Sequence, residues 1–281
     1  MNAVQIGESM RNRLHQGERV YGTHVVYPGG PDTLDQYQKL ALDFVFIDTE
    51  HTPLNRYDVS FLCRHFAARG ISPIVRITYP DGRLAAMALD GGAQGIVAPY
   101  VETVEQVKDL VGAVRYRPLK GKLLHEILHR SRHLNPKTQA YVDEYNRDQY
   151  LIIGIESVEA YQRLDALLAV PDVDGIFIGP HDLTVSMEIP EEYNHPVYLN
   201  TVLDIIKRSR EAQRGVGMHL KPTHIDERLF RQMIDHGMNW ILYYHDQHFM
   251  LDAMHQSFQQ IRRWAGEDAP SEGSNFTHVY P

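Results

Sequence analysis

Short apolar segments alternate with amphipathic segments along almost the whole chain. The apolar segments have the length of buried strands and cover residues 20–26, 43–48, 73–77, 95–99, 150–156, 174–179, 215–220 and 239–244. Each is apolar on both faces, which is typical of strands that helices cover on both sides. The amphipathic segments follow them at 33–41, 55–69, 82–91, 102–115, 157–169, 195–213, 225–236 and 246–264. This alternation predicts a parallel sheet built from βαβ units.

Eight strand–helix units in a chain of 281 residues favour a single (β/α)8 TIM barrel. We expect the barrel domain to span residues 1–264, with a helix at its N-terminus, and residues 265–281 to form a flexible C-terminal tail. A doubly wound sheet is the alternative. It would carry a glycine-rich phosphate loop after the first strand, and "HVVYPGGPD" lacks the GxGxxG pattern.

Composition narrows the class of protein further. A net charge of −8 without any basic run argues against a nucleic-acid-binding surface. The single cysteine, Cys63, excludes a disulfide framework and an all-thiolate metal site. The N-terminus is polar and no window approaches 18 apolar residues, so we expect neither a signal peptide nor a membrane span. A cytoplasmic protein is the default expectation.

Polar residues stand where several of the predicted strands end. In a parallel barrel these ends meet at one rim, which is where catalytic groups gather. The candidates at this rim are Asp48, Glu50, His51, Arg76, Glu156, Asp182, His219 and Lys221. Any one of them alone would be read as a helix cap or a hydrogen-bonded rim residue. Their convergence predicts a functional site.

These residue types suit enolate chemistry at a metal. Glu156 and Asp182 follow neighbouring strands, so two carboxylates can share a hard divalent cation such as Mg²⁺ or Mn²⁺ and leave most of its coordination open. His51 lies three residues after Asp48, a spacing at which the carboxylate can orient the imidazole as a base. Arg76 can stabilise an oxyanion that develops on a 2-oxo acid.

At these residues the chain resembles the HpcH/HpaI family of metal-dependent pyruvate aldolases. The resemblance rests on "DFVFIDTEHTP", "PIVRI", "ALDGGAQGIVAPYVETVEQV" and "IESVEAYQRLDALLAVPDVDGIFIGPHDL", and it covers roughly residues 18 to 260. It implies a class II aldolase that joins pyruvate to an aldehyde, or cleaves the 4-hydroxy-2-oxo acid product. It also implies a homohexamer or homotrimer in which the C-terminal helix is exchanged between subunits. Mg²⁺ or Mn²⁺ is the implied metal, with Co²⁺ and Zn²⁺ as further options.

The resemblance also assigns roles to residues around the metal. Glu156 and Asp182 would hold the ion, and pyruvate would chelate it through its carboxylate and keto oxygens. Backbone amides around Gly179, Pro180 and His181 would receive the pyruvate carboxylate.

The remaining assignments concern the base and its neighbours. His51, paired with Asp48, would be the base, and Arg76 would stabilise the enolate. Asp90 matches a position that in the family reaches the site of the neighbouring subunit.

Some positions depart from the family pattern, and they leave the substrate open. The family's usual glutamine two residues before the metal glutamate is Gly154, its aromatic residue in the first strand is His24, and a common glycine is Glu188. A biosynthetic relative that forms its enolate by decarboxylating oxaloacetate therefore stays as an alternative. A barrel that binds 2-oxo acids without turnover is the non-enzymatic alternative.

Two further motifs have competing interpretations. His125-Glu126-Ile127-Leu128-His129 matches the HExxH pattern of zinc peptidases, but no third ligand of the expected kind follows it, and a chance match is the simpler interpretation in a chain with 16 histidines. Lys221 could be the Schiff-base lysine of a class I aldolase. The carboxylate pair makes an imine unnecessary, so we expect an ordinary rim lysine there. We expect His219 to pack or hydrogen-bond at the rim.

Overall fold

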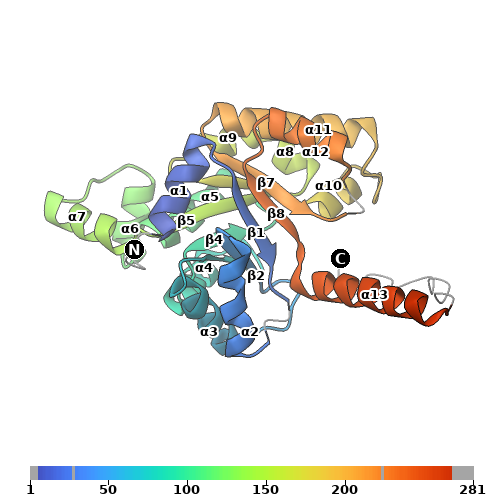
Figure 1. The fold of residues 1–281 in the computed structure, drawn as a ribbon. Helices are drawn as coiled ribbons and strands as arrows, with labels where there is room; N and C mark the ends of the chain where they lie inside the picture. Colours follow the sequence, from blue (N-terminus) through green and yellow to red (C-terminus); the bar gives the residue numbers. More distant parts are fainter. Residues whose placement is uncertain (1–5, 27–28, 223–224, 268–281) are drawn as a thin grey trace.

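A closed barrel of eight parallel strands forms the centre of the molecule (Figure 1). The structure, a computed structural model, describes residues 6–26, 29–222 and 225–267. The strands pair in chain order and close between β8 and β1. They are β1 Val20–His24, β2 Phe44–Asp48, β3 Ser72–Arg76, β4 Gly95–Ala98, β5 Tyr150–Ile155, β6 Gly175–Ile178, β7 Gly215–Leu220 and β8 Trp240–His245. The predicted TIM barrel is confirmed.

Helices precede, connect and follow the strands, and most of them cover the outside of the barrel. They are α1 Ile6–Gln16, α2 Pro31–Gln36, the 3-10 helix η2 Tyr37–Leu40, α3 Arg56–Ala67, α4 Gly82–Gly91, α5 Val104–Arg115, α6 Gly121–Leu128, α7 Pro136–Tyr145, α8 Val158–Gln162, α9 Leu164–Leu168, α10 Pro180–Ser186, α11 Pro196–Glu211, α12 Glu227–Asp235 and α13 Asp246–Ala265. The segment 157–169, predicted as one helix, is divided at Arg163 (φ −99°, ψ 6°) into α8 and α9. Helices α6, α7 and α10 were not predicted.

The barrel interior is packed with large apolar side chains. Phe44 stacks on Trp240 with ring centroids 5.3 Å apart, and Phe46 stacks on Phe177 at 6.1 Å. Helix α1 closes the N-terminal end, where Leu14 packs so tightly on Gly215 that a Cβ there would lie 2.8 Å from the leucine Cδ2. Because one end of the barrel is filled, a small molecule can enter only from the C-terminal end of the strands.

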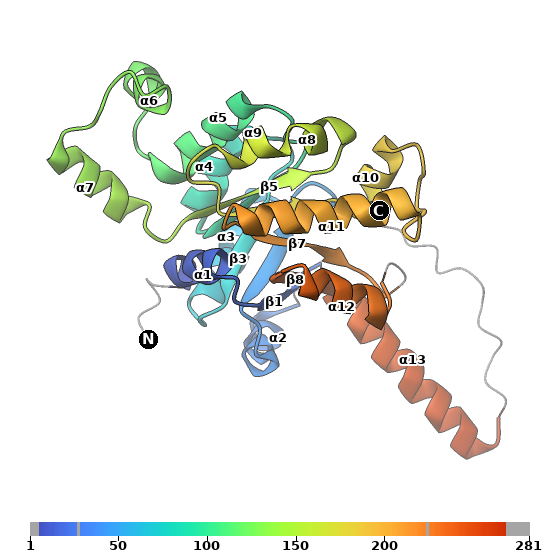
Figure 2. The same cartoon turned by 90° about the horizontal axis from the view of Figure 1, so that it is seen from above.

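Helix α13 follows β8 and projects away from the barrel in both views (Figures 1 and 2). None of its residues is buried, although its exposed side chains include Phe258 and Trp264. The predicted exchange of this helix between subunits stays a prediction. Within the described residues, no helix combines the length and the apolar character needed to cross a bilayer. The predicted tail at 265–281 lies outside the described residues from 268 onward.

Candidate functional site

A cavity of about 270 Å³ lies at the C-terminal end of the barrel. The residues that line it are His51, Arg76, Phe177, Gly179, Pro180, His181, Asp182, His219 and Lys221. They come from segments that are far apart in the sequence and that the closed sheet brings to one rim. Most of the predicted site residues therefore share one pocket.

Glu156 follows β5 and is almost completely buried, with 3% of its surface exposed. Its Oε2 accepts a hydrogen bond of 3.0 Å from the backbone N–H of Tyr100, whereas Oε1 has no partner among the described residues. Burial raises the pKa of Glu156 to about 8, although the Tyr100 amide and Arg76 act in the opposite direction. The nearby Asp182 adds to the rise. A buried carboxylate with an unsatisfied oxygen beside a second carboxylate is a fitting donor pair for a cation.

Two glycines make room for this carboxylate. A Cβ on Gly179 would lie 2.6 Å from Cγ of Glu156, and one on Gly154 would lie 3.1 Å from its Oε1. At position 154, where the family usually has a glutamine, the glycine thus lets the carboxylate of Glu156 lie close to the backbone. In this chain the hydrogen bond to Glu156 comes from the backbone of Tyr100.

The metal-free protein is expected to lose stability as the pH rises. Because the pKa of Glu156 is raised from 4.5 to about 8 on folding, the folded chain binds this proton more tightly than the unfolded chain. The free energy of unfolding should fall by about 1.4 kcal/mol per pH unit between these two pKa values. Urea unfolding with a chelator present measures this slope. Glu156→Gln should flatten it and the exposed control Glu159→Gln should not; a slope equal in all three proteins would contradict the assignment.

Asp48 and Arg76 form a buried ion pair across β2 and β3, where they occupy paired positions of the sheet. Nε of Arg76 donates to Oδ1 of Asp48 at 2.9 Å, and Nη2 donates to Oδ2 at 2.5 Å. Burial alone would raise the pKa of Asp48, but the hydrogen bonds and charge of Arg76 lower it to about 2. No described residue accepts a hydrogen bond from Nη1 of Arg76, which leaves this group for a ligand.

The predicted pairing of His51 with Asp48 is wrong in this structure. Both oxygens of Asp48 are occupied by Arg76, and Oδ1 also accepts from the backbone N–H of Glu50. The carboxylate nearest to His51 is that of Glu50, with Oε2 3.7 Å from the histidine Nε2 and 3.2 Å from Nε of Arg76. The register of β2 and β3 decides this, because it places the guanidinium directly beside Asp48.

Among residues 179–181, which were predicted to bind the substrate carboxylate through their backbone amides, one N–H is free to do so within the described part of the chain. Pro180 has no N–H, and the N–H of Gly179 donates to the carbonyl oxygen of Ile155 at 3.3 Å. The backbone N–H of His181 is therefore the one in this group that has no hydrogen-bond acceptor among the described residues. The imidazole of His181 lies at the edge of the pocket, 39% exposed and 3.9 Å from Glu191.

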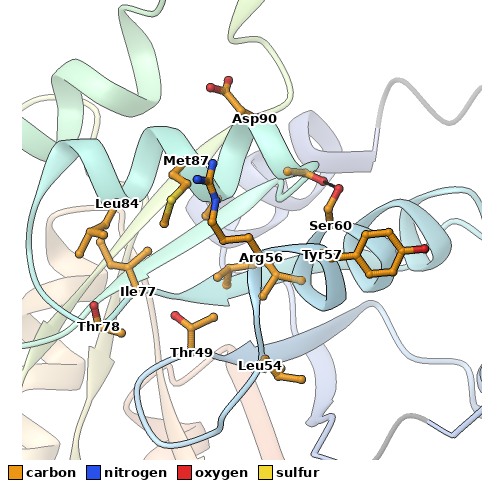
Figure 3. Close-up of a pocket in the computed structure, with 14 residues that line it drawn as sticks. Thr49, Leu54, Arg56, Tyr57, Ser60, Ile77, Thr78, Leu84, Met87 and Asp90 are labelled. Carbon is orange, nitrogen blue, oxygen red and sulfur yellow. Dashed lines mark hydrogen bonds between the residues drawn. The ribbon is translucent and has the colours of Figure 1, made fainter.

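Asp90 lies outside this pocket. It is on α4, where its carboxylate pairs with Arg117 at 2.7 Å. It borders a second cavity of about 430 Å³ between α3 and α4, in which Arg56 rises toward Met87 (Figure 3). Its predicted contact with the site of a neighbouring subunit stays a prediction.

The HExxH segment lies on the outside of the barrel against α5, in the link that contains α6 and α7 (Figure 1). The rings of His125 and His129 stack with centroids 4.1 Å apart, and Glu126 pairs with Lys122 and Arg132. In the described part of the chain, no group of three or more His, Cys, Asp or Glu side chains is arranged to hold a metal. The residues of the HExxH pattern thus form part of an exposed helix surface.

Replacing His125 and His129 together with alanine is expected to leave metal-dependent turnover within about twofold of wild type, since surface changes away from a site have small effects. Steady-state rates with and without a chelator measure this. A variant that no longer needs metal, or that is inactive, would revive the peptidase interpretation.

The sequence did not predict a histidine cluster at this rim. His24 ends β1, and its ring centroid lies 5.6 Å from that of His219 and 6.0 Å from that of His245. His245 in turn contacts His248, with the two Nδ1 atoms 2.9 Å apart. The signal was present in the sequence as histidines at the ends of three strands, but only closure of the barrel makes β7, β8 and β1 neighbours.

Comparison with known proteins places the chain in a family. The model of the HpcH/HpaI aldolase/citrate lyase family matches residues 28–251. The chain is 30% identical over 199 residues to the 2-keto-3-deoxy-L-rhamnonate aldolase of Klebsiella pneumoniae, which covers 71% of this chain and 73% of the relative.

Solved structures agree with this placement. The HpcH/HpaI aldolase of Desulfitobacterium hafniense shares the fold, with a TM-score of 0.75 at 23% identity over 95% of this chain and 98% of that one. The citrate synthase SbnG superposes with a TM-score of 0.74 at 26% identity over 92% and 99%. The chain therefore belongs to the HpcH/HpaI aldolase/citrate lyase family of divalent-metal-dependent carbon–carbon lyases.

Proposed function

We propose that the protein cleaves and forms 4-hydroxy-2-oxo acids through the enolate of pyruvate. The observation that carries this proposal is the buried carboxylate of Glu156, which has one oxygen without a partner among the described residues and lies near Asp182. Asp182 lines a pocket that also contains Arg76 and His51. A cation site, a positive group for an oxyanion and a titratable base are the parts that enolate chemistry needs.

Glu156 and Asp182 are the proposed metal ligands. Two carboxylates and no histidine suit Mg²⁺ or Mn²⁺, with Co²⁺ and Zn²⁺ as further options. When bound, such an ion would polarise the 2-oxo acid and stabilise negative charge on its keto oxygen. The backbone N–H of His181 is available to bind the substrate carboxylate.

The other pocket residues would move the proton and stabilise charge. In cleavage, the imidazole of His51 accepts the proton of the C4 hydroxyl, and Glu50 orients the ring. The C3–C4 bond breaks, the aldehyde leaves, and the electron pair of that bond passes to C2 and its oxygen as an enolate. Nη1 of Arg76 donates to this oxygen, while Asp48 holds the guanidinium in place. Protonation of C3 then yields pyruvate.

Proton exchange in D2O tests the proposal without knowledge of the aldehyde. Pyruvate incubated with the enzyme and Mg²⁺ or Mn²⁺ should exchange its methyl protons, as followed by NMR, and a chelator should stop the exchange. Absence of exchange with all four metals would refute the proposal and favour a binding-only barrel. A substrate screen then begins with 2-keto-3-deoxy-L-rhamnonate, the compound in the name of the Klebsiella relative.

A second candidate is an enzyme that forms its enolate by decarboxylating oxaloacetate. Its support is the 26% identity to the citrate synthase SbnG, together with His24 and Gly154 at positions that depart from the aldolase pattern. Rapid release of CO2 from oxaloacetate with Mg²⁺, without cleavage of any 4-hydroxy-2-oxo acid, would favour this candidate.

We propose that α13 packs on another subunit of a homohexamer or homotrimer. The support is that none of its residues is buried while Phe258, Ile261 and Trp264 are more than half exposed. Phe258→Glu with Trp264→Glu should therefore reduce the mass measured by sedimentation. Lys207→Glu, on the exposed surface of α11, is the control. An unchanged mass in the double variant would refute this packing.

A further inference from the structure

One wall of the pocket has no role in the proposed reaction. It is formed by His219 near the end of β7 and Lys221 just beyond β7, and His24 at the end of β1 packs behind it, with its ring centroid 5.6 Å from that of His219. In the closed order of strands, β6 lies between β7 and β5, after which Glu156 follows. The wall therefore adjoins the loop after β6 that carries Asp182, and it is two strands away from Glu156.

His219 in this wall and His24 behind it are neutral imidazoles. Burial lowers the pKa of His24 to about 4 and that of His219 well below its usual value. Nε2 of His219 lies 3.1 Å from the carbonyl oxygen of Tyr244, so it carries the hydrogen and leaves Nδ1 as an acceptor. His24 is only 8% exposed, and its Nε2 has no hydrogen-bond partner among the described residues.

Lys221 is the positive charge of this wall. It lines the pocket and is partly buried, yet it forms no ion pair or hydrogen bond within the described parts of the chain. Arg76, the other cation of the pocket, is held by Asp48 and Glu50. Glu191 acts on Lys221 only through its charge and lies 3.9 Å from His181. A partly buried ammonium without a partner is unfavourable unless a bound anion pairs with it.

We propose that Lys221, with His219 beside it, binds an anionic group at the far end of the aldehyde substrate. The anion is a carboxylate or a phosphate, and the aldehyde is thus an acidic one. This inference rests on the proposed aldolase function and names the class of its second substrate. The ammonium pairs with the anion, and Nδ1 of His219 accepts a hydrogen bond from a neighbouring hydroxyl of the substrate.

Aldehydes that differ mainly in the charge of one group test this inference. With pyruvate and Mg²⁺, we compare glyoxylate with glycolaldehyde, and glyceraldehyde 3-phosphate with glyceraldehyde. In one of the pairs, the wild type should prefer the charged aldehyde in kcat/KM by about 10- to 100-fold, the range expected for a hydrogen bond to a charged group. The pair that shows the preference identifies the anion. Added salt should weaken the preference.

Variants of Lys221 separate a charge effect from a structural one. Lys221→Met should abolish the preference, mainly by raising KM for the charged aldehyde, and Lys221→Arg should keep most of it because the charge remains. The matched control Lys207→Met removes an exposed lysine of α11 and should change nothing. A wild type without preference in either pair, or a preference that survives Lys221→Met, would overturn the inference.

Two measurements on the wild type distinguish the remaining outcomes. Reduction with borohydride in the presence of pyruvate should leave Lys221 unmodified, and attachment of pyruvate to it would overturn the inference by showing a Schiff base. Exchange of pyruvate methyl protons without any aldehyde tests the aldolase function itself. Exchange without selectivity for acidic aldehydes refutes only the anion site, whereas absence of exchange refutes both proposals.

Discussion

Glu156→Gln and Asp182→Asn are each expected to lower kcat/KM by at least about 1,000-fold while the barrel stays folded. Loss of one carboxylate charge weakens the binding of a divalent cation, and the several kcal/mol that a metal contributes to the transition state are lost with it. Glu156→Gln should also stabilise the metal-free protein at neutral pH, because it removes a carboxyl whose pKa burial raises to about 8.

Activity, metal titration and urea unfolding of the same samples check this result. Glu159→Gln, an exposed change on α8 three residues further along the chain, is the control and should behave as the wild type. Metal-dependent activity that persists in Glu156→Gln but disappears in the His125→Ala/His129→Ala variant would refute the assignment of the metal site.

Arg76→Met is expected to lower kcat by about 100- to 1,000-fold, the usual cost of losing a donor to a developing oxyanion. It should also destabilise the protein by about 3–5 kcal/mol, because it leaves the buried carboxylate of Asp48 without its partner. In the wild type, the lowered pKa of Asp48 contributes stability above its unfolded value of 3.8, and this stability is lost as the pH falls through about 2. In Arg76→Met this loss of stability between pH 3.8 and about 2 should therefore disappear, because burial then raises the pKa of Asp48 and its protonation removes an unpaired buried charge.

A double variant separates the two roles of Arg76. Arg76→Met with Asp48→Leu removes both charges, so much of the lost stability should return, since apolar pairs often replace buried ion pairs without cost. Activity should not return, because no donor faces the enolate oxygen. Recovery of activity together with stability would show that Arg76 acts only on the fold.

Local sequence signals were sufficient to predict all eight strands, but they did not predict every helix between the strands. The eight strands appear where apolar segments were found, because a run that is buried on both faces has few alternatives. Helices α6 and α7 were missed because they follow the predicted helix between β4 and β5. No strand-like segment separates them from that helix. The short helix α10 was missed for another reason: it begins at Pro180, directly after β6, within what reads as a loop.

The sequence by itself determined which residues reach the rim, because strand ends follow from the apolar runs and parallel strands end on the same side. Only the tertiary structure decided which of them meet. Asp48 pairs with Arg76, 28 residues away, rather than with His51 three residues away, because the register of β2 and β3 sets that contact. The unsatisfied oxygen of Glu156 likewise depends on packing, in which the backbone of Tyr100 satisfies one oxygen and leaves the other. Spacing along the chain carries no information about such contacts, since the pairing and register of neighbouring strands decide which residues lie side by side.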